Sequence, residues 1–152
     1  MIELKSEFLF TMTIVVEKMH MIGEAPIGRR RMDCFAGGSI EGPKVKGVIL
    51  PGGNDTLIGR RDGALLPNVR LLIRTDDDAL IYCDYRGIRC GPQEVMDAIA
   101  RGEQVEPDSY YLRNTPMFET ESKKYDWLNR VVAVGVGRRT PNSAIYEVFH
   151  IL

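Results

Sequence analysis

Seven polar or aromatic side chains have the chemical types that recognise and transform a small oxygen-bearing molecule. Arginine offers a fork of N–H donors that fits a carboxylate or enolate, and the usual small-ligand cavity combines a few such groups with apolar walls. A glutamate beside such a cavity has its pKa raised by desolvation and can act as a general acid or base. The candidate ligand-binding residues are Arg31, Arg74, Tyr82, Arg113, Trp127 and Asn129, and the candidate catalytic residue is Glu119.

Residues 69–86 form the segment around which the other elements are arranged. Two runs rich in β-forming residues, VRLLIR and ALIYCDYR, flank a polar cluster of one threonine and three aspartates, which predicts an antiparallel hairpin. We interpret neither face of this hairpin as cleanly apolar, because the first run contains two arginines and the second contains two tyrosines, an aspartate and an arginine. We therefore expect Arg74 and Tyr82 to lie near something buried, as in a small barrel with a polar-lined interior.

The remaining chain predicts short strands separated by turn signals. A single helix is expected between Pro92 and Gly102, where apolar residues recur at helical spacing. Residues 18–28 are interpreted as a connection, 37–43 as turns and 121–129 as a polar loop. The expected strands cover residues 7–17, 29–36, 44–50, 56–59, 64–66, 69–74, 79–86, 110–120, 130–138 and 144–152. This pattern predicts an all-β chain, with residues 1–152 forming one domain, a single antiparallel β-barrel with one short helix.

Composition excludes several classes of function. The net charge of −1 offers no general attraction to nucleic acid or to an anionic membrane, so neither partner is expected. Three cysteines without CxxC spacing favour a reducing compartment, and no secretory leader is evident, so a cytoplasmic location is expected. No metal is expected, because the two histidines lie far apart in the chain and the aspartates at 76–78 lack the spacing of a calcium-binding loop. No P-loop or dinucleotide-binding pattern is present, and no cofactor is expected.

Several motifs together resemble a known family. They are GRRR at 28–31, LPGGND at 50–55, RTDD at 74–77, ALIY at 79–82, PMFET at 116–120, YDWLN at 125–129 and VGVG at 134–137. In this order the chain resembles the family of domain of unknown function 3237. The resemblance implies a small, calycin-like β-barrel with a central cavity, often in oligomers, and it implies no assigned activity. One departure is Asp78, where we expect glycine in the hairpin turn; aspartate tolerates a positive φ, so the turn should persist.

The function expected from these observations is binding of a small, partly apolar, oxygen-bearing metabolite in the barrel. One alternative is a cofactor-free acid–base enzyme, such as an isomerase, cyclase or lactone hydrolase; another is a structural subunit whose barrel is filled by a self-satisfying Arg–Glu network. We expect the guanidinium groups of Arg74 and Arg113 to point into one shared space. Trp127 is expected either to cover the barrel mouth as a lid or to plug one barrel end as core. The valines of residues 132–136 share one strand face, which predicts a homodimer or higher homo-oligomer.

Overall fold

The computed structural model describes all residues from Met1 to Leu152. Besides the strands there are one α-helix, α1 (Gln93–Ala100), and two short 3₁₀ helices, η1 (Pro107–Ser109) and η2 (Asp126–Arg130). The strands are β1 (Ser6–Ala25), β2 (Gly28–Glu41), β3 (Lys46–Ile49), β4 (Asn54–Asp55), β5 (Ile58–Gly59), β6 (Leu65–Leu66), β7 (Asn68–Thr75), β8 (Leu80–Cys90), β9 (Tyr111–Glu119), β10 (Val132–Arg139) and β11 (Ser143–Ile151).

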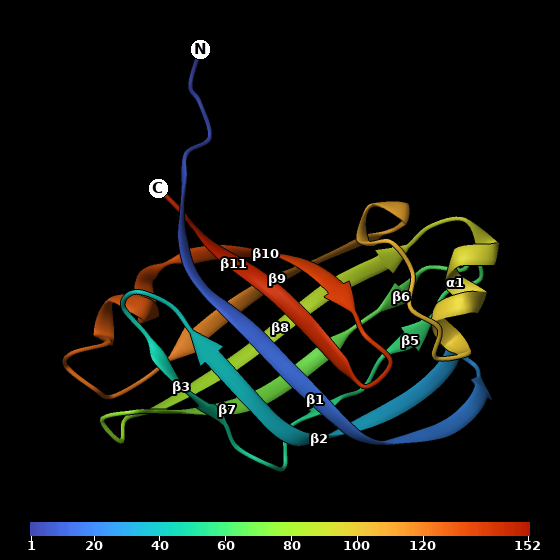
Figure 1. Cartoon of the computed structure of the whole chain (residues 1–152), viewed down its shortest axis with the longest axis horizontal. Helices are drawn as coiled ribbons and strands as arrows, with labels where there is room; N and C mark the ends of the chain where they lie inside the picture. The colour runs from blue at the N-terminus through green and yellow to red at the C-terminus, as the bar shows by residue number, and fades with distance from the viewer.

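The strands close into an antiparallel barrel (Figure 1). Eight strands form the ring, in the order β1, β2, β3, β7, β8, β9, β10 and β11, and β11 pairs again with β1. The short β4 lies between β2 and β7, while β5 and β6 bridge β2 to β8. The prediction of an antiparallel β-barrel with one short helix is therefore confirmed.

Alternation along the central hairpin sets the inside and the outside of the barrel. Val69, Leu71 and Ile73 of β7 are at most 2% exposed, and Ile81 and Cys83 of β8 face them in register. Side chains alternate across a strand, so the residues between these positions must point to the outer surface. The hairpin turn is closed by Asp78 at φ 68°, as expected for an aspartate replacing glycine there.

The first hairpin is longer than predicted. Residues 18–25, expected to be a connection, continue β1, and only two residues separate it from β2. Gly38, expected to lie in a turn, is inside β2, where it allows close approach to β1 across an irregular register. A Cβ atom at Gly38 would lie 1.9 Å from the carbonyl oxygen of Thr13, so the glycine is needed for contact between strands.

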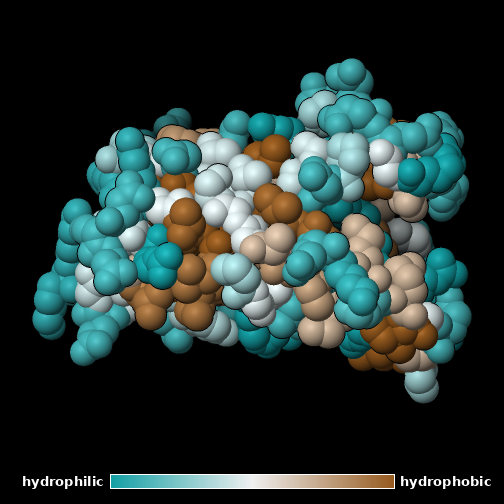
Figure 2. All heavy atoms as spheres, turned by 60° about the horizontal axis from the view of Figure 1, so that its bottom comes forward, coloured by the Kyte–Doolittle hydropathy of each residue, from teal (hydrophilic) through white to brown (hydrophobic).

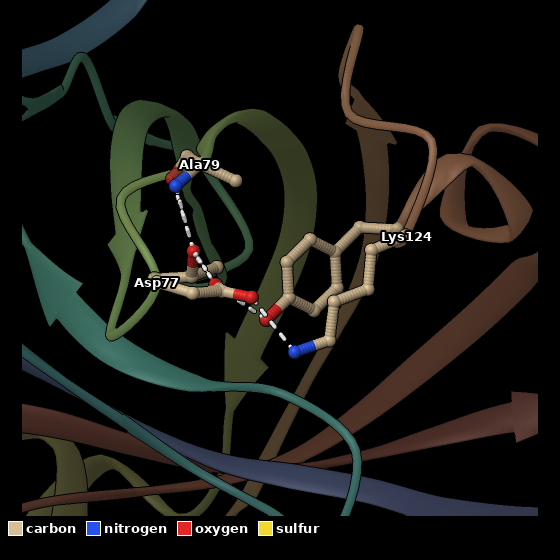
Figure 3. Close-up of polar contacts among 5 residues, drawn as sticks. Asp77, Ala79 and Lys124 are labelled. Atoms are coloured by element: carbon tan, nitrogen blue, oxygen red, sulfur yellow. Dashed lines mark hydrogen bonds and ion pairs between the residues drawn. The ribbon is translucent and has the colours of Figure 1, made fainter.

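One end of the barrel is closed by the segment that contains η2. Tyr125 and Leu128 are buried in the core, and the hydroxyl of Tyr125 donates to Oδ1 of Asp77 in the β7–β8 turn at 2.7 Å (Figure 3). Lys124 donates to Oδ2 of the same carboxylate at 2.7 Å, and the Thr75 hydroxyl donates to Oδ1 at 2.6 Å. These donors, Lys124 first, hold the pKa of Asp77 below its usual range. The aspartate turn is thus a structural anchor for the closing segment.

The outer wall is mixed in polarity. On the face shown in Figure 2, apolar groups lie between hydrophilic ones. Val48 of β3 and Leu72 of β7 are among the exposed apolar side chains of the barrel. No helix is both long and apolar enough to cross a membrane.

Candidate functional site

A polar cavity is lined in part by Leu57, Leu65 and Pro67, which lie in or next to β5 and β6. These two strands are at the end of the barrel opposite the η2 segment (Figure 1). The apolar wall of the cavity also includes Ile14, Phe35 and Leu112. The cavity encloses about 30 Å³, which is space for roughly two water molecules. The polar side chains that line it are Arg31, Asp33, Asp55, Tyr85, Arg89, Arg139 and Tyr146.

Arg31 and Asp33 are held against each other on β2. They are two residues apart on one strand, so both side chains face the interior. Nε of Arg31 donates to Oδ1 of Asp33 at 2.8 Å, and Nη2 donates to Oδ2 at 3.1 Å. The side chains are 16% and 3% exposed. This two-point pair fixes the orientation of both groups and satisfies the buried Asp33 carboxylate.

Asp55 of β4 stands directly opposite Asp33 in the ladder between β2 and β4. Residues opposed in this way have Cβ atoms about 4.5–5.5 Å apart, and two carboxylates so close repel each other. Burial, reinforced by the charge of Asp33, raises the pKa of Asp55 to about 6, although the backbone N–H of Asn68 donates to its Oδ1 at 2.9 Å. Asp55 can therefore exchange a proton near neutral pH.

Arg89 of β8 and Arg139 of β10 lack the partner that Arg31 has. Arg89 is 7% exposed, and the Nε atoms of both residues are buried without a hydrogen-bond acceptor. Burial, together with the neighbouring guanidinium groups, lowers the pKa of Arg89 to about 10 and also lowers that of Arg139. Arg139 is positioned through its backbone N–H, which donates to the hydroxyl of Tyr110 at 2.6 Å.

Tyr85 of β8 and Tyr146 of β11 form an edge-to-face pair with ring centroids 5.4 Å apart. Burial raises the pKa of Tyr146 to about 12 and that of Tyr85 well above its ordinary value. Both phenols therefore keep their protons at neutral pH and can donate hydrogen bonds. Space for the Tyr146 ring depends on β10, because a Cβ atom at Gly137 would lie 2.5 Å from Cε1 of Tyr146.

Of the seven residues singled out from the sequence, Arg31 alone lines this cavity. Arg74 and Glu119 are exposed, because each follows a buried residue on its strand and so faces outward. Tyr82 lies between buried Ile81 and Cys83 and also faces outward. The expectation of a glutamate beside the cavity is therefore wrong.

Arg113 also lies on the outer wall. Its guanidinium group stacks 4.5 Å from the ring centroid of Tyr111 and donates to the carbonyl of Leu112 at 2.9 Å. The expectation that Arg74 and Arg113 point into one interior space is therefore wrong. On each strand the two residues that flank the arginine are buried, so the arginine between them points outward.

Trp127 and Asn129 belong to the closed end of the barrel. Trp127 is half-buried against the core, with Nζ of Lys44 5.7 Å from its ring centroid. Asn129 is exposed, and its amide makes two hydrogen bonds with the backbone of Thr120. Trp127 therefore does not cover this cavity, and its half-buried ring packs against the core instead.

Strand alternation could have identified some of the cavity residues that the sequence analysis missed. Ile81, Cys83 and Tyr85 are inward positions of β8, and the same phase reaches Arg89 four residues beyond Tyr85. On β2, Arg31 and Asp33 share a face in the same way. The strand expected at residues 79–86 ends before Arg89, so the sequence analysis did not place Arg89 on the inward face of β8.

The fold and the site together define a class of protein: a small closed β-barrel with an arginine- and carboxylate-lined cavity at one end. Residues 4–151 match the family described as "Protein of unknown function (DUF3237)", and the chain belongs to this family. A "UPF0311 protein" from Clostridium acetobutylicum is 39% identical over 150 residues, which cover 98% of this chain and 95% of that protein. The resemblance seen in the sequence motifs is thus confirmed.

Solved structures have the same fold. A conserved protein of unknown function from Rhodopseudomonas palustris superposes with a TM-score of 0.94 at 32% identity, covering 100% of this chain and 99% of the other. A "beta-barrel like protein" from Acinetobacter baumannii gives a TM-score of 0.87 at 36% identity, covering 99% and 97%. A more distant relative, the "Hydroalkoxylation enzyme" of Penicillium herquei, is 25% identical over 129 residues, covering 85% of this chain and 71% of that protein.

Proposed function

We propose that the protein binds a small, partly apolar, oxygen-bearing metabolite in the polar cavity and carries out cofactor-free acid–base chemistry on it. The observation that carries this proposal is Asp55, a cavity carboxylate with a pKa of about 6 set opposite a second carboxylate and among three arginines. A proton-transferring group near neutral pH beside positive, preorganised donors is the arrangement that general acid–base catalysis requires.

Each polar group has a role in this proposal. Asp55 is mostly ionised at pH 7, so it takes a proton from a substrate hydroxyl or an acidic C–H group and returns it in a later step. Arg89 and Arg139 place in the cavity positive charge that no side chain pairs, which favours a substrate that carries or develops negative charge. Tyr85 and Tyr146 donate hydrogen bonds, and the apolar wall holds the carbon skeleton and excludes water.

The distant relative supports this class of chemistry. Hydroalkoxylation adds the O–H of an alcohol across a carbon–carbon double bond. The reaction needs a base that removes the hydroxyl proton and an acid that donates a proton to carbon. It involves no net oxidation or reduction, so it needs no redox cofactor. At 25% identity the name of the relative suggests the reaction class, and it leaves the substrate open.

Entry of a metabolite requires the cavity to widen, because about 30 Å³ holds only water-sized groups. The side of the barrel closed by β5 and β6 is the most weakly joined. β6 pairs with β8 through the single residue pair Leu65 and Arg89, and β5 pairs with β6 through two residue pairs. We propose that a ligand enters by displacement of this side.

A carrier that binds the same ligand without turnover is the second candidate, and the same cavity would serve it. The test is turnover of a panel of hydroxy-enones, enones and lactones by the parent protein and by Asp55→Asn. Loss of a catalytic acid–base group should lower the rate about 10²–10⁴-fold. Asp84→Asn is the matched control, since Asp84 lies on the outer face of β8. Ligand binding without turnover across the panel would favour the carrier, and equal rates in Asp55→Asn and the control would refute the role of Asp55.

A further inference from the structure

The cavity contains more positive than negative charge. Three guanidinium groups, of Arg31, Arg89 and Arg139, face two carboxylates, of Asp33 and Asp55. The Arg31–Asp33 pair is internally neutral. Asp55 carries at most one negative charge, and less as the pH approaches 6. At least one guanidinium charge therefore has no counter-charge in the site.

Two of these guanidinium groups, those of Arg89 and Arg139, also lack a hydrogen-bond acceptor for Nε, which is buried in both. Neither guanidinium group belongs to an ion pair of the structure. A buried charged donor left without a partner is strongly unfavourable, and natural interiors rarely keep one. Both residues line the same cavity, and their Nε donors need an acceptor that the chain itself does not provide.

We infer that Arg89 and Arg139 form a binding slot for the carboxylate of the ligand, so that the metabolite is a small organic acid. The Nε edge of a guanidinium presents two parallel N–H groups, which match the two oxygens of a carboxylate. Such a ligand neutralises the excess charge and satisfies both buried Nε donors at once. This inference names the substrate class for the proposed function and rests on it for the location of the site.

The slot also orients the ligand relative to Asp55. The acidic end lies against Arg89 on β8 and Arg139 on β10. Asp55 is on β4, which pairs with β2 and β7, so the remainder of the ligand extends across the barrel interior toward it. The reacting group therefore lies beyond the carboxylate in the molecule, and a neutral analogue of the same shape lacks the anchoring contact.

Acetate and acetamide are the probes, because they have the same shape and differ in charge. Titration of the parent protein is followed by the Nε–Hε signals in ¹H–¹⁵N spectra. The signals of Arg89 and Arg139 are assigned from their absence in Arg89→Gln and Arg139→Gln. We expect acetate, and not acetamide, to shift both signals in a saturable manner. Arg139→Gln should weaken acetate binding about 10-fold or more, since a hydrogen bond to a charged group is lost.

Arg138→Gln is the matched control, because Arg138 is the neighbouring arginine on β10 and is half-exposed, 3.8 Å from Glu147. Its acetate affinity should equal that of the parent. If acetate shifts neither signal, or if acetamide shifts them equally, the inference is overturned without any variant. Acetate binding with no turnover of the panel or of carboxylic acid analogues of its members would refute catalysis and retain the carboxylate slot. Asp55-dependent turnover of neutral substrates without acetate binding would refute the slot and retain catalysis.

Discussion

Replacing Asp55 by asparagine should make the folded protein more stable at neutral pH. Burial raises the pKa of Asp55 from 3.8 to about 6 in the folded state. Because one pKa unit corresponds to about 1.4 kcal/mol, the ionised carboxylate destabilises the folded protein by about 3 kcal/mol above about pH 7. Asparagine removes the charge and keeps an oxygen that can accept the hydrogen bond from the backbone N–H of Asn68.

The sign of the pH dependence follows from the raised pKa. Folding favours the protonated form of Asp55, so the parent gains stability as the pH falls from about 6 to about 4. Asp55→Asn has no such group and should show no such gain. The difference in unfolding free energy should therefore be about 3 kcal/mol above pH 7 and should disappear below pH 4.

Urea denaturation of both proteins at a series of pH values measures this difference directly. In thermal melts at pH 7.5 the variant should unfold about 6–12 °C higher, because about 1 kcal/mol corresponds to 2–4 °C in a chain of this size. Asp84→Asn on the outer wall controls for a change in overall charge and should give no such gain. A variant that is less stable than the parent at neutral pH, or a gain that does not change with pH, would contradict the assignment of Asp55 as a desolvated carboxylate.

Three further predictions concern the rest of the barrel. Trp127→Ala should lower the unfolding free energy by about 3 kcal/mol and leave acetate binding per folded molecule unchanged, because Trp127 belongs to η2 and packs against the core there, away from the residues that line the cavity. Weaker acetate binding in this variant would show that Trp127 does contribute to the site. Gly137→Ala should destabilise the protein by about 1–3 kcal/mol in urea denaturation, because the added methyl group overlaps the Tyr146 ring, and an unchanged midpoint would contradict this packing. We propose that the valine face of β10 mediates self-association, since Val132 and Val136 are 66% and 41% exposed while Ala133 is buried. Light scattering should give at least twice 17.1 kDa for the parent and a monomer for a variant with aspartate at both valines, and a monomeric parent would refute the proposal.

The architecture could be predicted from sequence because its signals are local. Alternation in β7 and β8, the polar turn that ends at Asp78, and the helical spacing between Pro92 and Gly102 each depend on neighbouring residues. The extension of β1 beyond residue 17 could not be predicted in this way. It depends on pairing with β2, and the glycine at 38, which resembles a turn signal, is required there by the approach of Thr13.

The site was harder to predict because inward-facing arginines do not differ in type from outward-facing ones. Arg74 and Arg89 both lie on the central hairpin, and the strand phase places the first outside and the second inside. Arg139 continues the inward phase of Ala133, Gly135 and Gly137, whose small side chains leave room for groups from other strands. The pairing of Asp33 with Asp55 arises between strands that are remote in sequence, so no local spacing reveals it.

The two ends of the barrel are built by opposite means. At the η2 end, Asp77 has its negative charge matched by Lys124 and by hydroxyl donors, and aromatic side chains fill the remaining space. At the cavity end, Asp55 holds a charge that burial disfavours, and Arg89 holds a donor with no acceptor. Apolar residues of similar volume commonly stabilise a protein more than buried charges do. Stability therefore does not account for the residues at the cavity end, whereas a ligand that supplies the missing acceptor and exchanges a proton with Asp55 accounts for both.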